Sequence, residues 1–124
     1  MSETQFVREP FATYLPGLKF VWGSSALPNV DCIGIVIAYL RYQGKSCPWE
    51  ADVRREYTTF EDGMKHMLSE NFVPDDEGEI FLLNTRPYAH IGFIENEIAY
   101  HITLEGLRQE STIAIKNRFR YMGQ

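Results

Sequence analysis

The sequence predicts an α+β domain in which helices come first and an antiparallel sheet follows. The chain has 124 residues, the size of one domain. Residues 33–72 favour helix, whereas residues 80–122 hold short apolar runs separated by turn residues, which is typical of strands. Helices grouped before strands indicate the α+β class. We expect residues 1–124 to form a single domain, with residues 1–19 as an N-terminal arm suited to docking.

The first element after a loop-rich start is the apolar run from Ile33 to Leu40. Its composition fits a buried strand or a buried helix, and its continuation beyond Leu40 favours the helix. Asn29 or Asp31 is the expected N-cap, and Gly44 is the expected residue just past the C-terminal end. The run is too short to span a bilayer.

Residues 49–72 are predicted to be further helix. Thr58 precedes Glu61 and Thr59 precedes Asp62, each at the spacing of a capping box. The apolar side chains that follow at helical spacing are Met64, Met67, Leu68 and Phe72.

Strands are predicted after the polar loop at residues 74–78. The tight connection Glu95-Asn96-Glu97 joins two of them as a hairpin. The expected strands are residues 80–83, 89–94, 98–104, 111–115 and 118–122.

The charge of the chain argues against several partners. Twelve Lys and Arg oppose 17 Asp and Glu, which gives a net charge of -5 and a pI near 5.1. A net negative charge repels phosphate backbones and anionic membranes, so we expect no nucleic-acid binding and no membrane insertion. The N-terminus lacks the basic and apolar regions of a secretory signal, so we expect no signal peptide.

Cys32 stands where the predicted central helix begins. The free N–H groups and the dipole of a helix start lower the pKa of a thiol, and the thiolate is a nucleophile. The alternative is a small buried apolar residue. Cys47 has no helix start or histidine near it, so it is interpreted as structural or incidental. Two separately placed cysteines favour free thiols over one bridge, and no zinc spacing occurs, so no metal or cofactor is expected.

His90 and His101 lie on neighbouring predicted strands, across one hairpin. Either alone is best explained as a hydrogen-bonded core residue. Together with Cys32 they fit another arrangement, in which one imidazole serves as a base and the second fixes its tautomer. His66 lies beside Lys65 in a predicted helix and is expected at the surface.

Several stretches, in order along the chain, resemble the NlpC/P60 family of cysteine peptidases. Residues 20–23 (Phe-Val-Trp-Gly) resemble its aromatic-x-Trp-Gly stretch, and residues 31–36 (Asp-Cys-Ile-Gly-Ile-Val) resemble its Asp-Cys-Ser-Gly-Leu-Val nucleophile motif. Residues 77–82 resemble its Pro-Gly-Asp-Leu strand entry. Residues 90–94 (His-Ile-Gly-Phe-Ile) resemble its His-Val-Gly-Ile-Tyr strand, and Tyr-His at 100–101 resembles the Ile-His that follows.

The resemblance implies a papain-like fold and a Cys-His-His triad. Cys32 would be the nucleophile, His90 the general base and acid, and His101 the residue that orients His90. The family hydrolyses amide bonds in the stem peptides of bacterial peptidoglycan through a thioester intermediate. The expectation is therefore a cell-wall-degrading cysteine endopeptidase, a thiol protease whose substrate is the stem peptide.

Two departures from the family pattern shape this expectation. Phe20 stands where the family usually has a Tyr, whose hydroxyl is thought to assist at the oxyanion. Ile33 replaces the usual Ser, as in members that resemble phage tail-tip proteins. We therefore expect a virion protein of the tail tip, made in the host cytoplasm and bound to other tail-tip proteins. The alternatives are a structural tail protein with little activity, which Phe20 favours, and an intracellular thiol amidase or acyltransferase.

Overall fold

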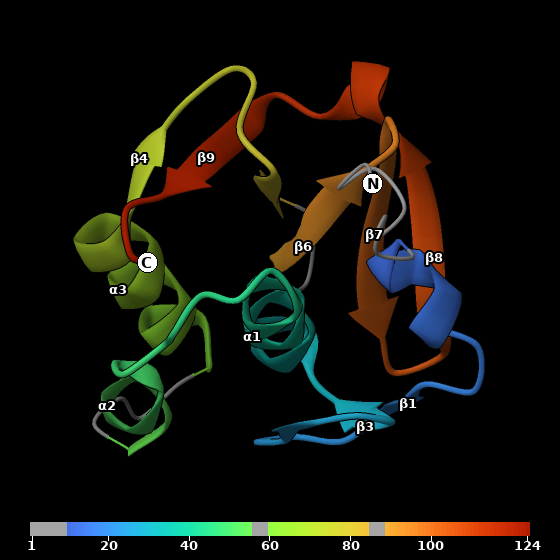
Figure 1. Cartoon of the computed structure of the whole chain (residues 1–124), viewed down its shortest axis with the longest axis horizontal. Helices are drawn as coiled ribbons and strands as arrows, with labels where there is room; N and C mark the ends of the chain where they lie inside the picture. Colours follow the sequence, from blue (N-terminus) through green and yellow to red (C-terminus); the bar gives the residue numbers. More distant parts are fainter. Residues whose placement is uncertain (1–9, 56–59, 85–88) are drawn as a thin grey trace, which may run out of the picture.

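The computed structural model describes residues 10–55, 60–84 and 89–124. A central helix, α1, is flanked on one side by helices α2 and α3, and a six-stranded sheet arcs around it (Figure 1). A small sheet lies at the end of α1 where that helix begins. The predicted α+β class is confirmed.

Helix α1 runs from Cys32 to Tyr42, and both of its predicted caps are confirmed. Asp31 is the N-cap residue. At the other end Gly44 has a φ of 85°, and its N–H donates to the Arg41 carbonyl at 2.9 Å. The next N–H, of Lys45, donates to the Leu40 carbonyl at 3.0 Å, which completes a Schellman motif. Every residue from 32 to 40 is buried, as expected for a helix that is surrounded by other elements.

The segment predicted as helix over residues 49–72 holds two helices. Helix α2 spans Glu50–Arg55 and helix α3 spans Phe60–Asn71, and each has acidic residues in its first turn, where the helix dipole favours them. The capping-box residues Thr58 and Thr59 lie outside the described residues. The prediction was wrong at Phe72, which begins a strand rather than ending the helix.

The large sheet is antiparallel throughout, with the strand order β4-β9-β5-β6-β7-β8. Its strands are β4 (Phe72–Pro74), β5 (Ile80–Leu83), β6 (His90–Glu95), β7 (Ile98–Thr103), β8 (Gly106–Ser111) and β9 (Asn117–Tyr121). Asn96 and Glu97 both have positive φ and form the two-residue turn between β6 and β7. Four of the predicted strands are thus present, each within one residue at either end.

The strand predicted over residues 111–115 is wrong. The strand that pairs with β7 is β8, which ends at Ser111, and Thr112–Ala114 form a 3-10 turn, η3. β-branched residues favoured the later segment. Ile113 is 93% exposed and only Ile115, which follows the 3-10 turn, is buried, so the segment does not bury alternate residues as a strand would.

Short elements fill the loop-rich start of the chain. A 3-10 helix, η2, covers Phe11–Tyr14. A three-stranded sheet in the order β1-β3-β2 follows, and its residues carry no periodic pattern that predicts it. Its strands are β1 (Lys19–Phe20), β2 (Ser25–Ala26) and β3 (Asn29–Val30).

The core has two clusters, one on each face of the large sheet. On the face toward α1, Ile91 and Phe93 of β6 pack in the main cluster. The Phe93 ring stacks on that of Tyr39 of α1, with 4.4 Å between the ring centroids. On the other face, Phe81 and Ile94 belong to a smaller cluster. Side chains alternate between the two faces along each strand. Among the described residues no helix is long and apolar enough to cross a membrane.

Candidate active site

Cys32 is the first residue of α1, the position predicted for it. The preceding strand β3 is bonded between β1 and β2, so the chain enters the helix from a fixed direction. The residue is buried, with 2% of its surface exposed. Its backbone position suits a nucleophile, whereas its thiol is closed off from solvent.

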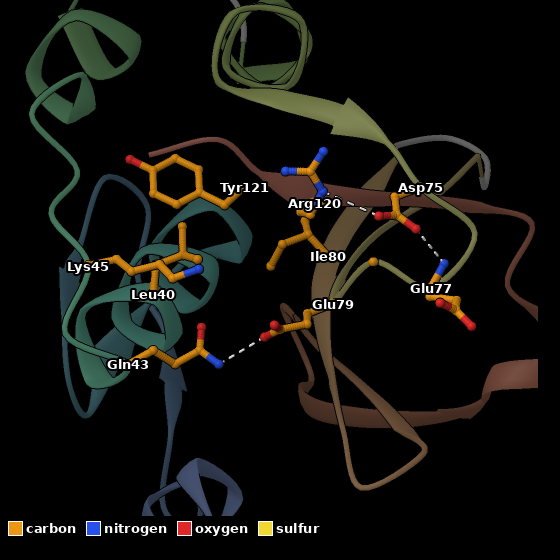
Figure 2. A pocket seen from close by; sticks show the side chains of 10 residues that line it. Leu40, Gln43, Lys45, Asp75, Glu77, Glu79, Ile80, Arg120 and Tyr121 are labelled. Atoms are coloured by element: carbon orange, nitrogen blue, oxygen red, sulfur yellow. Dashed lines mark hydrogen bonds and ion pairs between the residues drawn. The ribbon is translucent and has the colours of Figure 1, made fainter. Parts of the chain in front are cut away.

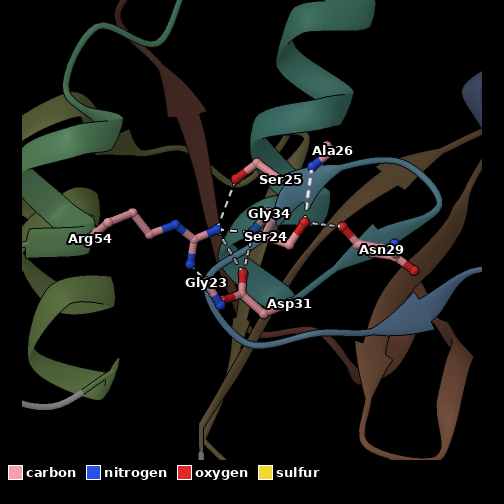
Figure 3. Close-up of polar contacts among 8 residues, drawn as sticks. All are labelled: Gly23, Ser24, Ser25, Ala26, Asn29, Asp31, Gly34 and Arg54. Atoms are coloured by element: carbon pink, nitrogen blue, oxygen red, sulfur yellow. Dashed lines mark hydrogen bonds and ion pairs between the residues drawn. The ribbon is translucent and has the colours of Figure 1, made fainter.

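The Asp31 carboxylate holds the start of this helix in place (Figure 3). It accepts the Gly34 N–H at 2.7 Å as the helix cap and the Gly23 N–H at 2.8 Å from the preceding turn. The Arg54 guanidinium of α2 binds both carboxylate oxygens, one of them at 2.9 Å. Asp31 has no exposed surface. The ion pair with Arg54 and the two backbone hydrogen bonds therefore stabilise a carboxylate that would otherwise be costly to bury.

Gly34 allows the turn at Ser24 to lie against the helix start. A Cβ atom at Gly34 would lie 2.0 Å from the Ser24 carbonyl oxygen, closer than any real contact. The same oxygen accepts the Asp31 N–H at 3.1 Å, so the turn is bonded where the missing side chain leaves room. The Asp-Cys-x-Gly pattern therefore has a local physical reason: a cap, a residue at the helix start and a close backbone approach.

Burial raises the pKa of the Cys32 thiol to about 12. A hydrogen bond from the Ile91 backbone of β6 lowers the pKa, and so does the charge of Arg54, while Asp31 raises it. The backbone N–H of Cys32 at the helix start lowers the pKa, as predicted, but the predicted net shift toward neutrality was wrong. The loss of hydration outweighs the favourable N–H groups because the thiol is enclosed by the main core cluster.

The structure brings the two predicted histidines together. The register pairs Gly92 of β6 with His101 of β7, which makes His90 a diagonal neighbour of His101 on the same face. Their ring centroids are 5.3 Å apart. The prediction that these imidazoles lie on adjacent strands is confirmed.

Cys32 and the histidine pair both lie near the end of β6. The pairing of β6 with β7 begins at Gly92, so His90 and Ile91 lie beyond the paired part, and the Ile91 N–H is turned to the thiol. Ile91 faces α1, whereas His90 shares the opposite face with Gly92. The thiol lies near Ile91 on the α1 side of β6, whereas the His90 imidazole lies on the opposite face.

Both imidazoles are short of hydrogen bonds. The Nδ1 atoms of His90 and His101 are buried and have no hydrogen-bond partner. Burial lowers the pKa of both rings. Protonation of His101 would oppose that of His90, and for His101 Glu110 raises the pKa while Arg108 lowers it. These shifts favour two neutral imidazoles and a protonated thiol at neutral pH. Buried polar atoms without partners are uncommon in folded proteins and mark a candidate functional site.

The sequence did not predict two polar partners of the site. Glu110 of β8 lies with its Oε2 atom 3.3 Å from Nε2 of His101, and Arg54 pairs with Asp31. Glu110 falls outside the strand predicted for that region. No local signal in the sequence connects Arg54 with Asp31, because the contact depends on how α2 packs.

Phe20 stands at the position where the NlpC/P60 family usually has a Tyr, so the hydroxyl of that Tyr is missing here. It pairs with Val30 in the small sheet, and its ring meets that of Trp22 edge-on at 4.7 Å. Cys47 and Cys32 are both free and buried. Among the described residues no group of His, Cys, Asp and Glu could hold a metal ion.

A separate small pocket lies at the far end of α1 (Figure 2). Its walls include Gln43, the residue that follows α1, whose amide donates to Glu79 at 2.8 Å. Tyr39 donates to the same carboxylate, and burial together with that carboxylate raises the pKa of the phenol. Cys32 lies at the other end of the helix, so the pocket is not part of the candidate site.

Searches of family models, curated proteins and solved structures found no match to this chain. The NlpC/P60 resemblance therefore stays a prediction that rests on the residues quoted for it.

Proposed function

We propose that this protein is a cysteine hydrolase of the NlpC/P60 type with a papain-like arrangement, in which Cys32 attacks an amide bond. The observation that carries the proposal is the convergence of α1 and β6. The Ile91 backbone acts on the thiol at the helix start and lowers its pKa. The preceding residue of the strand is His90, whose ring centroid lies 5.3 Å from that of His101. A nucleophile, a base and an orienting group are the parts that thiol catalysis needs.

The raised pKa of the Cys32 thiol and the lowered pKa of both imidazoles favour general-base activation. They disfavour a thiolate that exists before substrate binds. Neutral His90 takes the thiol proton as Sγ of Cys32 attacks the carbonyl carbon, and a tetrahedral oxyanion forms. The N–H groups of Cys32 and Ile33 are the first-turn donors that the Asp31 carboxylate does not take, so they can bind this oxyanion.

The second half of the reaction returns the site to its starting state. His90 gives its proton to the leaving amine as the C–N bond breaks, which leaves a thioester on Cys32. His90 then removes a proton from water, which attacks the thioester, and the thiol is released with that proton. This step requires the Cys32 thiol and the His90 imidazole to come within hydrogen-bond reach when substrate binds, since catalytic hydrogen bonds often form only in the complex.

The proposed substrate is the stem peptide of bacterial peptidoglycan, and the proposed setting is the tip of a phage tail. The ordered motifs around Cys32, His90 and His101 support the substrate, and Ile33 supports the phage setting. Other tail-tip proteins are the proposed partners, within a virion.

A structural tail protein with little activity is the second candidate. The observations in its favour are the buried thiol, whose pKa is raised to about 12, and the missing hydroxyl at Phe20. Loss of one oxyanion donor costs roughly a hundredfold or more in rate in other enzymes.

Digestion of purified peptidoglycan separates the two candidates. Wild type should release stem-peptide fragments, Cys32→Ala and His90→Ala should release none, and His101→Ala should release fewer. Cys47→Ala is the matched control, because it removes the other buried thiol and should digest like wild type. Wild type that releases no fragments, alone or with tail proteins, would contradict the hydrolase.

A further inference from the structure

Glu110 ends a row of three polar side chains that crosses three neighbouring strands. The registers pair Gly92 with His101 and Ala99 with Glu110, so His90, His101 and Glu110 follow one another diagonally on one face of the sheet. The two rings are 5.3 Å apart, and Nε2 of His101 is 3.3 Å from the Glu110 carboxylate. The row runs from β8 to the end of β6 where Cys32 lies.

The Glu110 carboxylate is the hydrogen-bond partner of a ring that is almost fully enclosed. His101 is 5% exposed, and its Nδ1 atom has no partner. An ionised carboxylate can only accept, so Nε2 must carry the hydrogen in this contact. In a neutral imidazole the other nitrogen is then an acceptor, so Glu110 selects which nitrogen of His101 holds the proton.

We propose that Glu110 is a positioning residue that fixes the tautomer of His101 and, through it, that of His90. Nδ1 of His101 has no partner in the structure, so as an acceptor it is available to Nε2–H of His90, whose ring centroid is 5.3 Å away. Nδ1 of His90, which is buried and without a partner, then has its lone pair available for the thiol proton. Only this last step rests on the proposed function, because the tautomer of His101 is a property of the fold.

The charges around His101 determine what removal of the carboxylate does. His90 faces the ring from β6, and Arg108 and Glu110 face it from β8, while the Phe81 ring of β5 lies edge-on at 6.2 Å. Glu110 raises the pKa of His101, and Arg108 lowers it. The Glu110 side chain is 41% exposed, so water screens its contribution in part. Without that carboxylate, His101 should protonate at lower pH.

Nitrogen NMR of the histidine rings in the full chain tests the proposal. In wild type, His101 should carry its hydrogen on Nε2. In Glu110→Gln, whose amide both donates and accepts, the two tautomers should mix, and the ring should titrate at lower pH. Glu110→Asp should restore part of the wild-type behaviour. Glu77→Gln is the matched control, because it removes an equal charge at an exposed loop position and should change neither property.

An unchanged tautomer and titration of His101 in Glu110→Gln would overturn the inference, provided that the variant unfolds at the temperature of wild type. If wild type cleaves stem peptides, the same variant should show a lower kcat at an unchanged KM. If wild type cleaves no stem peptide while the NMR result is as expected, the proposed function fails and the role of Glu110 in the fold stands.

Discussion

Two polar groups flank Cys32, and they differ in how completely their hydrogen bonds are made. The Asp31 cap, formed by Asp31 with Gly23, Gly34 and Arg54, saturates one buried carboxylate. The histidine pair, His90 and His101, leaves a buried Nδ1 atom without a partner on each ring. The cap thus fixes the backbone at the helix start. In the histidine pair, the two Nδ1 atoms remain available to accept a hydrogen bond or a proton.

This difference separates stability from function within one small site. A satisfied buried ion pair is costly to break, because removal of one partner leaves the other uncompensated. An unsatisfied buried nitrogen already costs free energy, and proteins keep such groups where a reaction needs them. Substitutions in the cap should therefore unfold the protein, and substitutions in the pair should inactivate it while the fold remains.

The largest expected effect is at Asp31. Asp31→Ala removes the helix cap and leaves the Arg54 guanidinium, which is 17% exposed, without its carboxylate. We expect a loss of about 3–5 kcal/mol in the free energy of unfolding, measured in urea. The double variant with Arg54→Leu should recover part of that loss, because no unpaired charge remains. A loss below about 1 kcal/mol in Asp31→Ala would contradict the role given to the cap.

A substitution at Gly34 tests the close approach of the Ser24 turn to the start of α1. In Gly34→Ala the new Cβ atom would meet backbone, the Ser24 carbonyl, so the turn has to shift. We expect a loss of about 2–3 kcal/mol in unfolding free energy. Gly17→Ala is the control, since nothing lies near its Cβ position and only its φ of 85° is unfavourable, at about 1 kcal/mol. Equal losses in the two variants would remove the case for close packing at Gly34.

His101 tests the other half of the comparison. His101→Leu replaces an imidazole with a buried unsatisfied nitrogen by an apolar side chain of similar size. We expect the unfolding free energy to change by less than about 1 kcal/mol, in either direction, because the partner left behind, Glu110, reaches water. Peptidoglycan digestion should fall in the same variant. A loss of stability as large as that in Asp31→Ala would contradict the distinction.

The smallest expected effect is the dependence of stability on pH. The pKa of both His90 and His101 is lowered in the folded state, so below the ordinary value of about 6.5 the unfolded chain binds protons that the folded chain does not. This contribution is complete above pH 6.5 and is lost as the pH falls below it. Urea midpoints of wild type at pH 7.5 and 5.5 should differ more than those of His101→Leu. Equal differences in the two proteins would contradict neutral, buried imidazoles.

The sequence was sufficient for the elements whose side chains carry a strong local pattern. The central helix, its Gly44 end and two N-cap candidates, of which Asp31 is the N-cap, were predicted, because capping and an apolar run are local features. The same holds for the hairpin that carries His90 and His101. Strand β8 was misplaced because its burial is partial and irregular, and its pairing with β7 determines its position.

The chemistry of the site was less accessible than its geometry. The expected pKa of Cys32 had the wrong sign, because a position in sequence gives the helix start and does not give the depth of burial. Arg54 and Glu110 each act over contacts between separate elements, with α2 packed near the start of α1 and with β8 paired to β7. Such partners follow from tertiary packing, which a single sequence does not encode locally.

The central claim is that Cys32 is activated by His90 when a stem peptide is bound. A stem peptide with a chloromethyl ketone in place of the scissile amide tests this claim, with the site of alkylation determined by mass spectrometry. We expect wild type to be alkylated at Cys32 and not at Cys47, and His90→Ala to react far more slowly. Equal alkylation of Cys32 in wild type and His90→Ala, or none in wild type, would contradict the account.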